Sequence, residues 1–395
     1  MSDGRPLPRP EGGPSLVGHV RARHGPELAA AVDRVVAPFG GWAAVARRGE
    51  RIVVKVNLLR GAPPEKAVST HPETLRCVLR ALKAAGAQPI VADSPGGPNL
   101  AATLARFWRV SGIAAMCEQE GVAIANAESE AVELPTPSGR LYRSFSVGRV
   151  FAEADAIVQV GVLKTHQLMR LTGGVKLAFG CIPGLGKAQL HIRASRREDF
   201  ADMLLDLYLA LAPRLTIIDG ILAMEGQGPG GGTPRELGSL FAARDAIALD
   251  AALADRTNHR RGEVYTLAAA ERRGLIDLDD PYRVAGDPVE PEPDFAPAVK
   301  DAEGMVPARF RGVARRSIAA RPRLVRADVC TRCGECAAIC GVQAITLAPT
   351  PVYDDERCVR CYACTEVCPT GAIDAVAPPL ARVLSAFGGR RTRRY

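Results

Sequence analysis

The sequence predicts an α/β protein whose mostly parallel sheet is covered by helices on both faces, followed by a small α+β domain at the C-terminus. Two observations lead to this prediction. Short runs of β-branched residues alternate with helical stretches over residues 1–285, and such alternation is typical of parallel strands joined by helices. Eight of the eleven cysteines then lie within residues 330–368, which indicates a separate compact module.

The expected strands are short apolar runs bounded by polar or turn residues. They span residues 52–56, 89–92, 156–162, 215–218 and 240–243. Helices are expected at residues 26–37, 72–85, 99–110, 198–211 and 245–255. The helix at 72–85 has the clearest boundaries, because it begins with Pro72, carries Glu73 in its first turn and stops at Gly86.

Composition divides the chain into four segments. They are an α/β domain (1–285), a linker rich in Pro and Arg (286–324), the cysteine-rich domain (325–376) and a basic tail (377–395). At 395 residues the chain is long enough for two or three domains. It has no run of 18 apolar residues and no signal segment at its start. The sequence therefore predicts a cytoplasmic protein that does not enter a membrane.

The cysteines repeat one spacing, C-x2-C-x2-C-x3-C, in two copies. Bacterial two-cluster ferredoxins use this spacing, and the fourth cysteine of each copy ligates the other cluster. We therefore expect two 4Fe-4S clusters as cofactors. One would be held by Cys330, Cys333, Cys336 and Cys368, and the other by Cys358, Cys361, Cys364 and Cys340. Paired zinc sites or a disulfide framework fit less well, because zinc knuckles are usually separated by a longer gap.

Residues 325–376 resemble the bacterial-type 2×4Fe-4S ferredoxin family. The resemblance implies single-electron transfer. One departure concerns the residue after the fourth cysteine of each copy. Pro369 follows the second copy as the family pattern requires, whereas Gly341 stands at the equivalent place in the first. We expect the turn near Cys340 to differ from its counterpart.

The chain is basic, with a formal net charge of +8. Arginines gather between residues 309 and 326 and again at 390–394. These runs are read either as a solvated linker and tail or as a dock for an acidic electron donor. Nucleic-acid binding is disfavoured, because aromatic residues make up only 5% of the chain and do not interleave with the basic run.

Polar side chains follow the expected strands at their carboxyl ends, where open α/β sheets bind ligands. We expect them to surround one pocket for a small-molecule substrate. The candidate catalytic residues are Lys164, His166 and His191. The candidate substrate-binding residues are Lys55, Asn57, Asp93, Arg170, Lys176 and Asp219. Arg244 and Asp245 would close the same rim after the last strand, although helix caps also favour aspartate.

Two glycine-rich segments, 170–187 and 224–232, could cradle a phosphate or carboxylate or simply form turns. Neither carries a nucleotide-binding fingerprint. With these residues in view, residues 50–260 resemble the domain-of-unknown-function family 362. The resemblance is carried by V-K-V-N at 54–57, A-D-S-P-G-G at 92–97, L-K-T-H at 163–166, L-T-G-G-V-K at 171–176, I-D-G-I-L-A-M-E-G-Q-G-P at 218–229 and A-R-D-A-I-A-L-D at 243–250. It implies an iron–sulfur protein of α/β type. Leu177 stands where family members commonly have Asn.

Two functions follow as hypotheses. The first is an iron–sulfur oxidoreductase that takes electrons from an external ferredoxin or flavodoxin and reduces an activated double bond or conjugated ring at the rim. The second is an electron-transfer subunit or metallocofactor assembly factor without its own substrate chemistry. For that role Asp93, Asp219, Asp245, Asp250 and His166 form a candidate hard-metal set. A homodimer stays open as a further partner arrangement.

Overall fold

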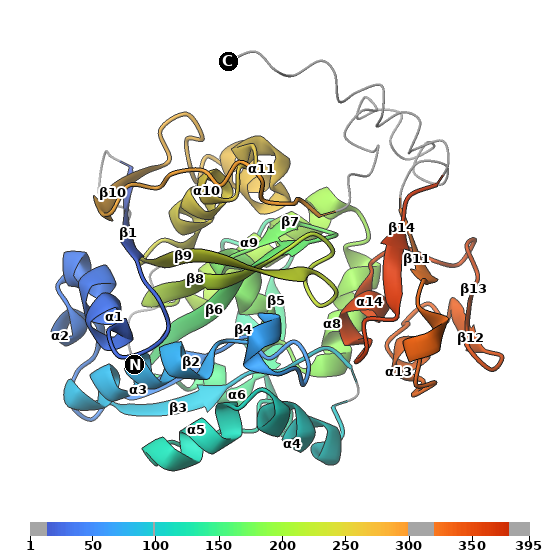
Figure 1. Cartoon of the computed structure of the whole chain (residues 1–395), viewed down its shortest axis with the longest axis horizontal. Coiled ribbons are helices and arrows are strands. Elements are labelled where there is room, and N and C mark those ends of the chain that lie inside the picture. Colours follow the sequence, from blue (N-terminus) through green and yellow to red (C-terminus); the bar gives the residue numbers. More distant parts are fainter. Residues whose placement is uncertain (1–13, 98, 299–319, 379–395) are drawn as a thin grey trace.

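The computed structural model describes residues 14–97, 99–298 and 320–378. Its centre is an eight-stranded sheet in the order β10-β1-β9-β8-β6-β2-β3, with β7 paired to β6 (Figure 1). The strands are β1 (Ser15–Arg21), β2 (Arg51–Lys55), β3 (Gln88–Ala92), β6 (Ala156–His166), β7 (Arg170–Thr172), β8 (Leu215–Glu225), β9 (Thr233–Ala243) and β10 (Tyr282–Gly286). The fold is thus the expected α/β class.

Helices cover both faces of the sheet. On one face α1, α3 and α5 bury Leu28, Leu75 and Ile113, and on the other α9, α10 and α11 bury Phe200, Leu249 and Leu267. The helices of this domain are α1 (Leu28–Val36), α2 (Trp42–Val45), α3 (Pro72–Ala84), α4 (Ala101–Val110), α5 (Ile113–Glu120), α6 (Arg149–Ala152), α7 (Gly174–Leu177), α8 (Gly184–Arg193), α9 (Arg197–Leu211), α10 (Ala246–Arg256) and α11 (Tyr265–Arg272).

The prediction of a polar rim requires all five expected strands to be parallel, but the last of them, β9, runs in the opposite direction. β9 is antiparallel to both β8 and β1, so its last residue lies at the opposite edge of the sheet from the end of β2. Asp245 there caps α10 by accepting a hydrogen bond from the Ile247 amide at 2.9 Å. The expectation that Arg244 and Asp245 join the rim is therefore wrong.

Several elements escaped the sequence prediction or are longer than it expected. β6 continues to His166 because β7 folds back on it as an antiparallel partner. Much of the glycine-rich segment 170–187 is helical, because it contains α7, a 3-10 turn at Ala178–Cys181 and the first turn of α8. A peripheral hairpin, β4 (Ala131–Pro135) and β5 (Ser144–Gly148), was not expected, and neither were β1 and the edge strand β10.

The C-terminal domain contains two small antiparallel sheets and two short helices. β11 (Arg321–Leu324) pairs with β14 (Ile373–Val376), and β12 (Ile345–Leu347) pairs with β13 (Pro351–Tyr353). α13 (Glu335–Ala338) and α14 (Ala363–Val367) pack between them with the cysteines in one apolar cluster. β11 falls within the segment that the sequence assigned to the linker. Most of the Arg run at 309–326 and the arginines at 390–394 lie outside the described residues.

Several contacts between described residues join the two domains, which lie side by side in Figure 1. The buried Arg60 guanidinium donates to the carbonyl oxygens of Cys368 and Gly230. Gln167 donates to Asp374 at 2.8 Å. A β-carbon at Gly341 would lie 2.6 Å from Cδ1 of Ile192 on α8. A bulkier residue at position 341 would press on α8, which gives a physical reason for the departure from the ferredoxin pattern.

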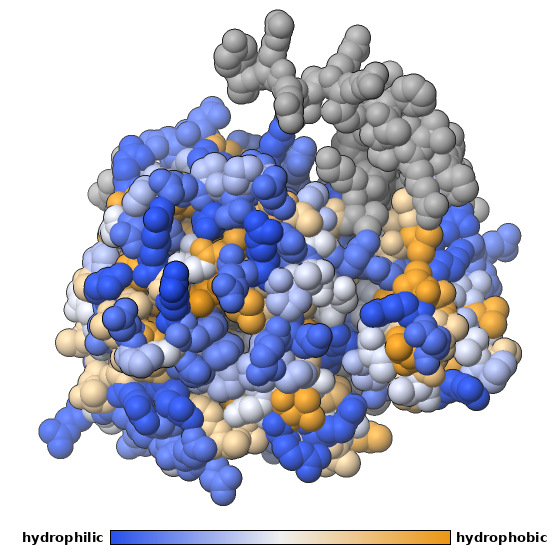
Figure 2. All heavy atoms as spheres, viewed as in Figure 1, coloured by the Kyte–Doolittle hydropathy of each residue, from blue (hydrophilic) through white to orange (hydrophobic). Residues whose placement is uncertain are grey.

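The outer surface is mostly hydrophilic on the face shown in Figure 2, and apolar residues appear there as small separate patches. The C-terminal domain contributes Val325, Val329, Leu347 and Val352 to the exposed apolar residues. Within the described ranges, no helix is long and apolar enough to cross a membrane.

Candidate active site

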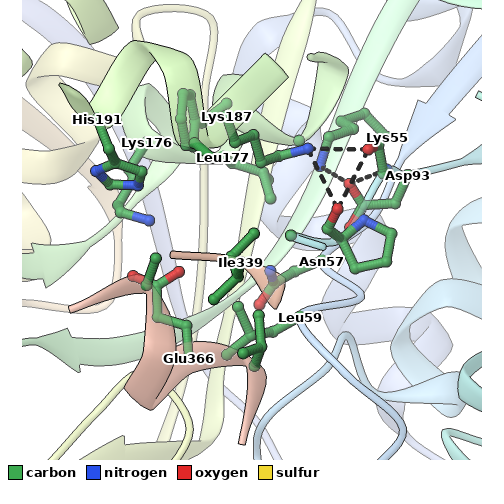
Figure 3. A pocket seen from close by; sticks show the side chains of 18 residues that line it. Lys55, Asn57, Leu59, Asp93, Lys176, Leu177, Lys187, His191, Ile339 and Glu366 are labelled. Carbon is green, nitrogen blue, oxygen red and sulfur yellow. Dashed lines mark hydrogen bonds and ion pairs between the residues drawn. The ribbon is translucent and has the colours of Figure 1, made fainter. Parts of the chain in front are cut away.

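A cavity of about 70 Å³ lies where the carboxyl ends of β2 and β3 meet α7, α8 and the C-terminal domain (Figure 3). Lys55, Asn57 and Asp93 line it from the strand ends. Lys176 from α7, and Lys187 and His191 from α8, form a second wall. Ile339, Ala363, Glu366 and Val367 close it from the C-terminal domain. The site is therefore shared between the sheet and the cysteine-rich domain.

A buried ion pair forms the floor of the cavity. The Lys55 ammonium lies 2.8 Å from Oδ1 of Asp93, and both side chains are almost fully buried. Asp93 also accepts hydrogen bonds from the backbone amides of Leu58 and Ser94. A side chain at Gly180 would overlap both members of the pair. Because every partner of Asp93 is a donor inside the site, the carboxylate holds Lys55 in a fixed position.

Lys187 lies beside this pair, as Figure 3 shows. Its ammonium donates to Oγ of Ser94 at 2.9 Å and to the carbonyl oxygen of Ile182. Burial lowers the pKa of Lys187 to about 8, against the opposing influence of the Asp93 charge. Lys187 is thus a cation that burial makes ready to release a proton near neutral pH.

Opposite this floor, Glu366 on α14 faces Lys176 and His166. Nδ1 of His166 accepts hydrogen bonds from the Leu168 and Met169 amides, so its Nε2 carries the proton. Nε2 lies 3.0 Å from Oε1 of Glu366 but lacks hydrogen-bond alignment, and both atoms are buried without a hydrogen-bond partner in the described chain. These atoms can accept a hydrogen-bonding ligand without breaking an existing bond.

Charged groups of opposite sign, Glu366 and Lys176, face each other in the cavity. Burial alone would raise the pKa of Glu366, but the Lys176 ammonium, with His166 and His191, holds it well below its usual range. Burial, together with the Lys176 charge, lowers the pKa of His166 to about 4. In the part of the chain that the structure describes, the Lys176 ammonium makes no hydrogen bond and no ion pair within 4.0 Å. At neutral pH the site therefore holds an ionised Glu366, a neutral His166 and an available lysine.

His191 completes this wall from α8. Its ring stacks on Phe200 at 4.4 Å between centroids, and its Nδ1 is buried with no hydrogen-bond partner among the described residues. Burial lowers the pKa of His191 to about 4. Its ring is therefore neutral and keeps one nitrogen for a ligand.

Lys164 lies behind the cavity and does not line it. Its ammonium donates to Oδ1 of Asn57 at 2.6 Å and to the carbonyl oxygen of Val68 at 2.7 Å. Burial lowers the pKa of Lys164 to about 7, and the Lys176 charge adds to this effect. Since Asn57 lines the cavity, Lys164 touches the site through the amide of Asn57.

The buried ammonium of Lys164 predicts a pH dependence of stability. In the unfolded chain its pKa returns to about 10.4, so above pH 7 the unfolded state binds a proton that the folded state has lost. The free energy of unfolding should then rise with pH between about 7 and 10, by up to about 1.4 kcal/mol per pH unit. Below that window both states are protonated and this contribution is constant.

Lys164→Met should reduce the slope of the rise, as measured by anaerobic urea unfolding across that window. Part of the slope should persist, because Lys187 also has a lowered pKa and acts in the same direction. An unchanged slope in the variant would show that Lys164 keeps its proton in the folded protein.

Two of the expected substrate-binding residues do not line the cavity. Asp219 lies 3.0 Å from Nε2 of His24 and accepts from the hydroxyl of Thr74. Arg170 sits on β7 and is absent from the cavity lining. The interior position of Asp219 follows from β8, which runs on to Glu225. The expectation that either residue binds substrate in this cavity is wrong.

The candidate hard-metal set is dispersed. Asp93 pairs with Lys55, Asp219 binds His24, and Asp250 accepts from the backbone amides of Gly174 and Val175. No group of three His, Cys, Asp or Glu in the described ranges is placed to hold a single metal ion. These aspartates serve as pair and cap residues in the fold.

Sequence reasoning missed Glu366 and the wall that α14 forms. Glu366 lies in the run C-T-E-V-C between two expected cluster ligands, where an acidic residue is easily taken for solvated surface. The hydrogen bond between the Lys187 ammonium and Ser94 was not predicted either. Their meeting depends on the packing of α8 against the strand ends, which no local pattern reveals.

Six of the eight repeat cysteines pack in one cluster, and the exchange of the fourth ligand between the two copies stays a prediction from their spacing. The thiol of Cys336 interacts electrostatically with those of Cys333 and Cys368. Cys361 interacts in the same way with Cys358 and Cys340. Cys364 interacts with members of both groups, Cys361, Cys358 and Cys340 on one side and Cys336 on the other.

Comparison with known proteins agrees with this geometry. Residues 329–372 match the model of the 4Fe-4S dicluster domain, so the chain is an iron–sulfur protein with 4Fe-4S clusters as its cofactors. The chain is 34% identical over 258 residues to the thylakoid-associated protein sll1697 of Synechocystis sp., covering 63% of this chain and 75% of that protein.

A solved structure, the lactate racemase apoprotein from Thermoanaerobacterium thermosaccharolyticum, aligns over 60% of this chain and 55% of its own, so the chain spans about half of that protein. The TM-score is 0.40 at 14% identity, and this likeness is too distant to support an inference. Residues 52–255, about half of the chain, match the model of a domain of unknown function, DUF362, and the chain therefore belongs to the DUF362 family.

Proposed function

We propose that this protein is an iron–sulfur oxidoreductase that passes single electrons to a small anionic substrate in the cavity between the sheet and α14. The main support is the position of Glu366, Ala363 and Val367. All three line the cavity from α14, which contains Cys364 and is followed directly by Cys368. A substrate there would lie within a few residues of the cluster ligands. The bound clusters supply electrons one at a time.

The chain's own residues bind the substrate and supply protons. Lys176 attracts an anionic group and stabilises negative charge that develops on it. His166 is neutral, so its Nε2–H next to Glu366 serves as a hydrogen-bond donor and not as a source of protons. Reduction of a double bond consumes two electrons and two protons, and Lys187, whose lowered pKa lies near neutrality, supplies one proton, is reprotonated from solvent and supplies the other.

The size of the cavity narrows the substrate class. A volume of about 70 Å³ is smaller than the roughly 150 Å³ cavity that admits benzene. The reacting part is therefore an activated double bond of a few atoms, conjugated to a carboxylate, in preference to a conjugated ring.

The test is anaerobic reoxidation. Reduced holoprotein is mixed with acrylate, crotonate, maleate or benzoate, and recovery of the visible cluster absorption is timed. We expect small unsaturated carboxylates to reoxidise the protein faster than buffer, and benzoate to have no effect. If no carboxylate exceeds the buffer rate, the reductase proposal fails and an electron-transfer subunit becomes the better description.

The proposed electron donor is an external ferredoxin or flavodoxin, because no nicotinamide or flavin fingerprint occurs in the sequence. A cytoplasmic location is also proposed, because a reducing compartment keeps the thiolate ligands of the clusters reduced. Reduction of the clusters by a purified flavodoxin, followed by EPR spectroscopy, would test the donor.

A further inference from the structure

A surface groove of about 330 Å³ lies next to the inner cavity. It runs between the start of α4 and the C-terminal domain. Its apolar lining consists of Leu100, Phe107, Ala338 and Val367, and the rest of the lining comprises three glycines with Asn99, Thr103, Cys333 and Glu335. Leu100 is 68% exposed at the outer end of this lining.

The groove and the inner cavity share two lining residues, Gly96 and Val367. These two face each other, because a β-carbon added at Gly96 would lie 3.7 Å from Cγ1 of Val367. Glycine at this position leaves open the space that any side chain would fill. Gly96 and Val367 therefore form the boundary between the groove and the cavity.

The two compartments differ in chemistry. Lys176, Lys187 and His191 make the inner cavity suited to an anionic group, whereas the groove offers apolar surface. An amphiphilic molecule would place its charged head inside and its hydrocarbon tail outside. The inner volume accommodates only a small head, so any longer substrate needs the groove.

We propose that the groove is the entrance to the cavity and holds the apolar tail of a carboxylate substrate, with Gly96 and Val367 as the constriction around the chain. This inference rests on the proposed function for the assignment of the inner cavity to an anionic head. It adds that the substrate is a carboxylate with an aliphatic chain, and that Gly96 and Val367 limit the width of that chain.

The test uses a thiol placed in the inner cavity by Ser94→Cys in the holoprotein. Ser94 is buried, and its hydroxyl lies 2.9 Å from the Lys187 ammonium and also donates to the Glu128 carboxylate. Methyl methanethiosulfonate is the probe, and peptide mass spectrometry follows labelling at residue 94 separately from Cys77, Cys117 and Cys181. Acetate, butanoate, hexanoate and octanoate serve as protecting ligands.

Protection should strengthen with chain length, by up to about fourfold for each added methylene that enters the groove. Gly96→Val should slow labelling by about tenfold or more, because its methyl groups close the constriction toward Val367. Leu100→Asp should remove the gain with chain length. Val110→Asp, a partly exposed apolar residue at the other end of α4 that does not line the groove, is the matched control and should change neither result.

Labelling at the same rate in Gly96→Val, with iron content and circular dichroism unchanged, would overturn the entrance. Equal protection by acetate and octanoate would overturn the tail site. If Gly96→Val does not fold, Leu100→Asp on the surface still decides the question. Protection is measured without electron transfer, so loss of the chain-length effect with reoxidation by acrylate intact would reject the groove alone. The opposite outcome would reject the reductase alone.

Discussion

Replacing Lys176 with methionine should slow reoxidation of the reduced holoprotein by small unsaturated carboxylates by about 100-fold or more. Removing one preorganised donor from a developing anion typically has an effect of this size. Lys176 is suited to the role because its ammonium has no hydrogen bond and no near ion pair in the described chain, and it faces Glu366 across the cavity. Methionine preserves the length of the side chain and removes the charge.

Two variants serve as controls for the Lys176 result. Lys66→Met removes an exposed lysine outside the cavity and should leave the rate unchanged. Lys164→Met should have an intermediate effect, since Lys164 reaches the site only through Asn57. Full activity of Lys176→Met at saturating carboxylate, with an unchanged KM, would remove Lys176 from the substrate site.

Replacing Cys336 with alanine should remove about half of the protein's iron. Cys336 lies with Cys333 and Cys368, so its loss should disable one 4Fe-4S cluster and spare the other. Cys364→Ala is the counterpart in the second set and should also retain about half. Iron and acid-labile sulfide are measured per chain, together with the EPR spectrum of the reduced protein.

The double variant Cys336→Ala/Cys364→Ala should then be free of iron. Cys77→Ala is a matched control, because Cys77 lies on α3 and is far in sequence from both sets. Full iron in Cys336→Ala would contradict its assignment as a ligand. Complete loss in both single variants would show that each cluster needs the other to stabilise the domain.

Local patterns were sufficient for most elements that lie within one buried strand or one bounded helix. The apolar run at β2 and the Pro72 start of α3 appear where the sequence predicts them. The same patterns failed at β9, because a short apolar run does not say whether its strand is parallel or antiparallel. Because β9 is antiparallel to its neighbours, Asp245 lies at the opposite edge of the sheet from the cavity.

Local patterns likewise identified some residues of the candidate site and misplaced others. Lys55, Asn57, Asp93, Lys176 and His191 were selected from strand ends and glycine-rich segments, and the structure brings them to one cavity. His166 was also selected, and it reaches the site through its contact with Glu366. Asp219 was selected by the same reasoning, yet it binds His24 and Thr74 elsewhere.

By itself, the sequence determined the chemistry of the cofactor, because the spacing of eight cysteines is a property of one short stretch of chain. It also determined the strand-and-helix rhythm, which follows from local burial periodicity. Only the tertiary structure decided that α14 forms a wall of the cavity and that Glu366 meets His166 and Lys176. Those side chains are about 200 residues apart in sequence, and their meeting depends on how two domains pack, which no local pattern encodes.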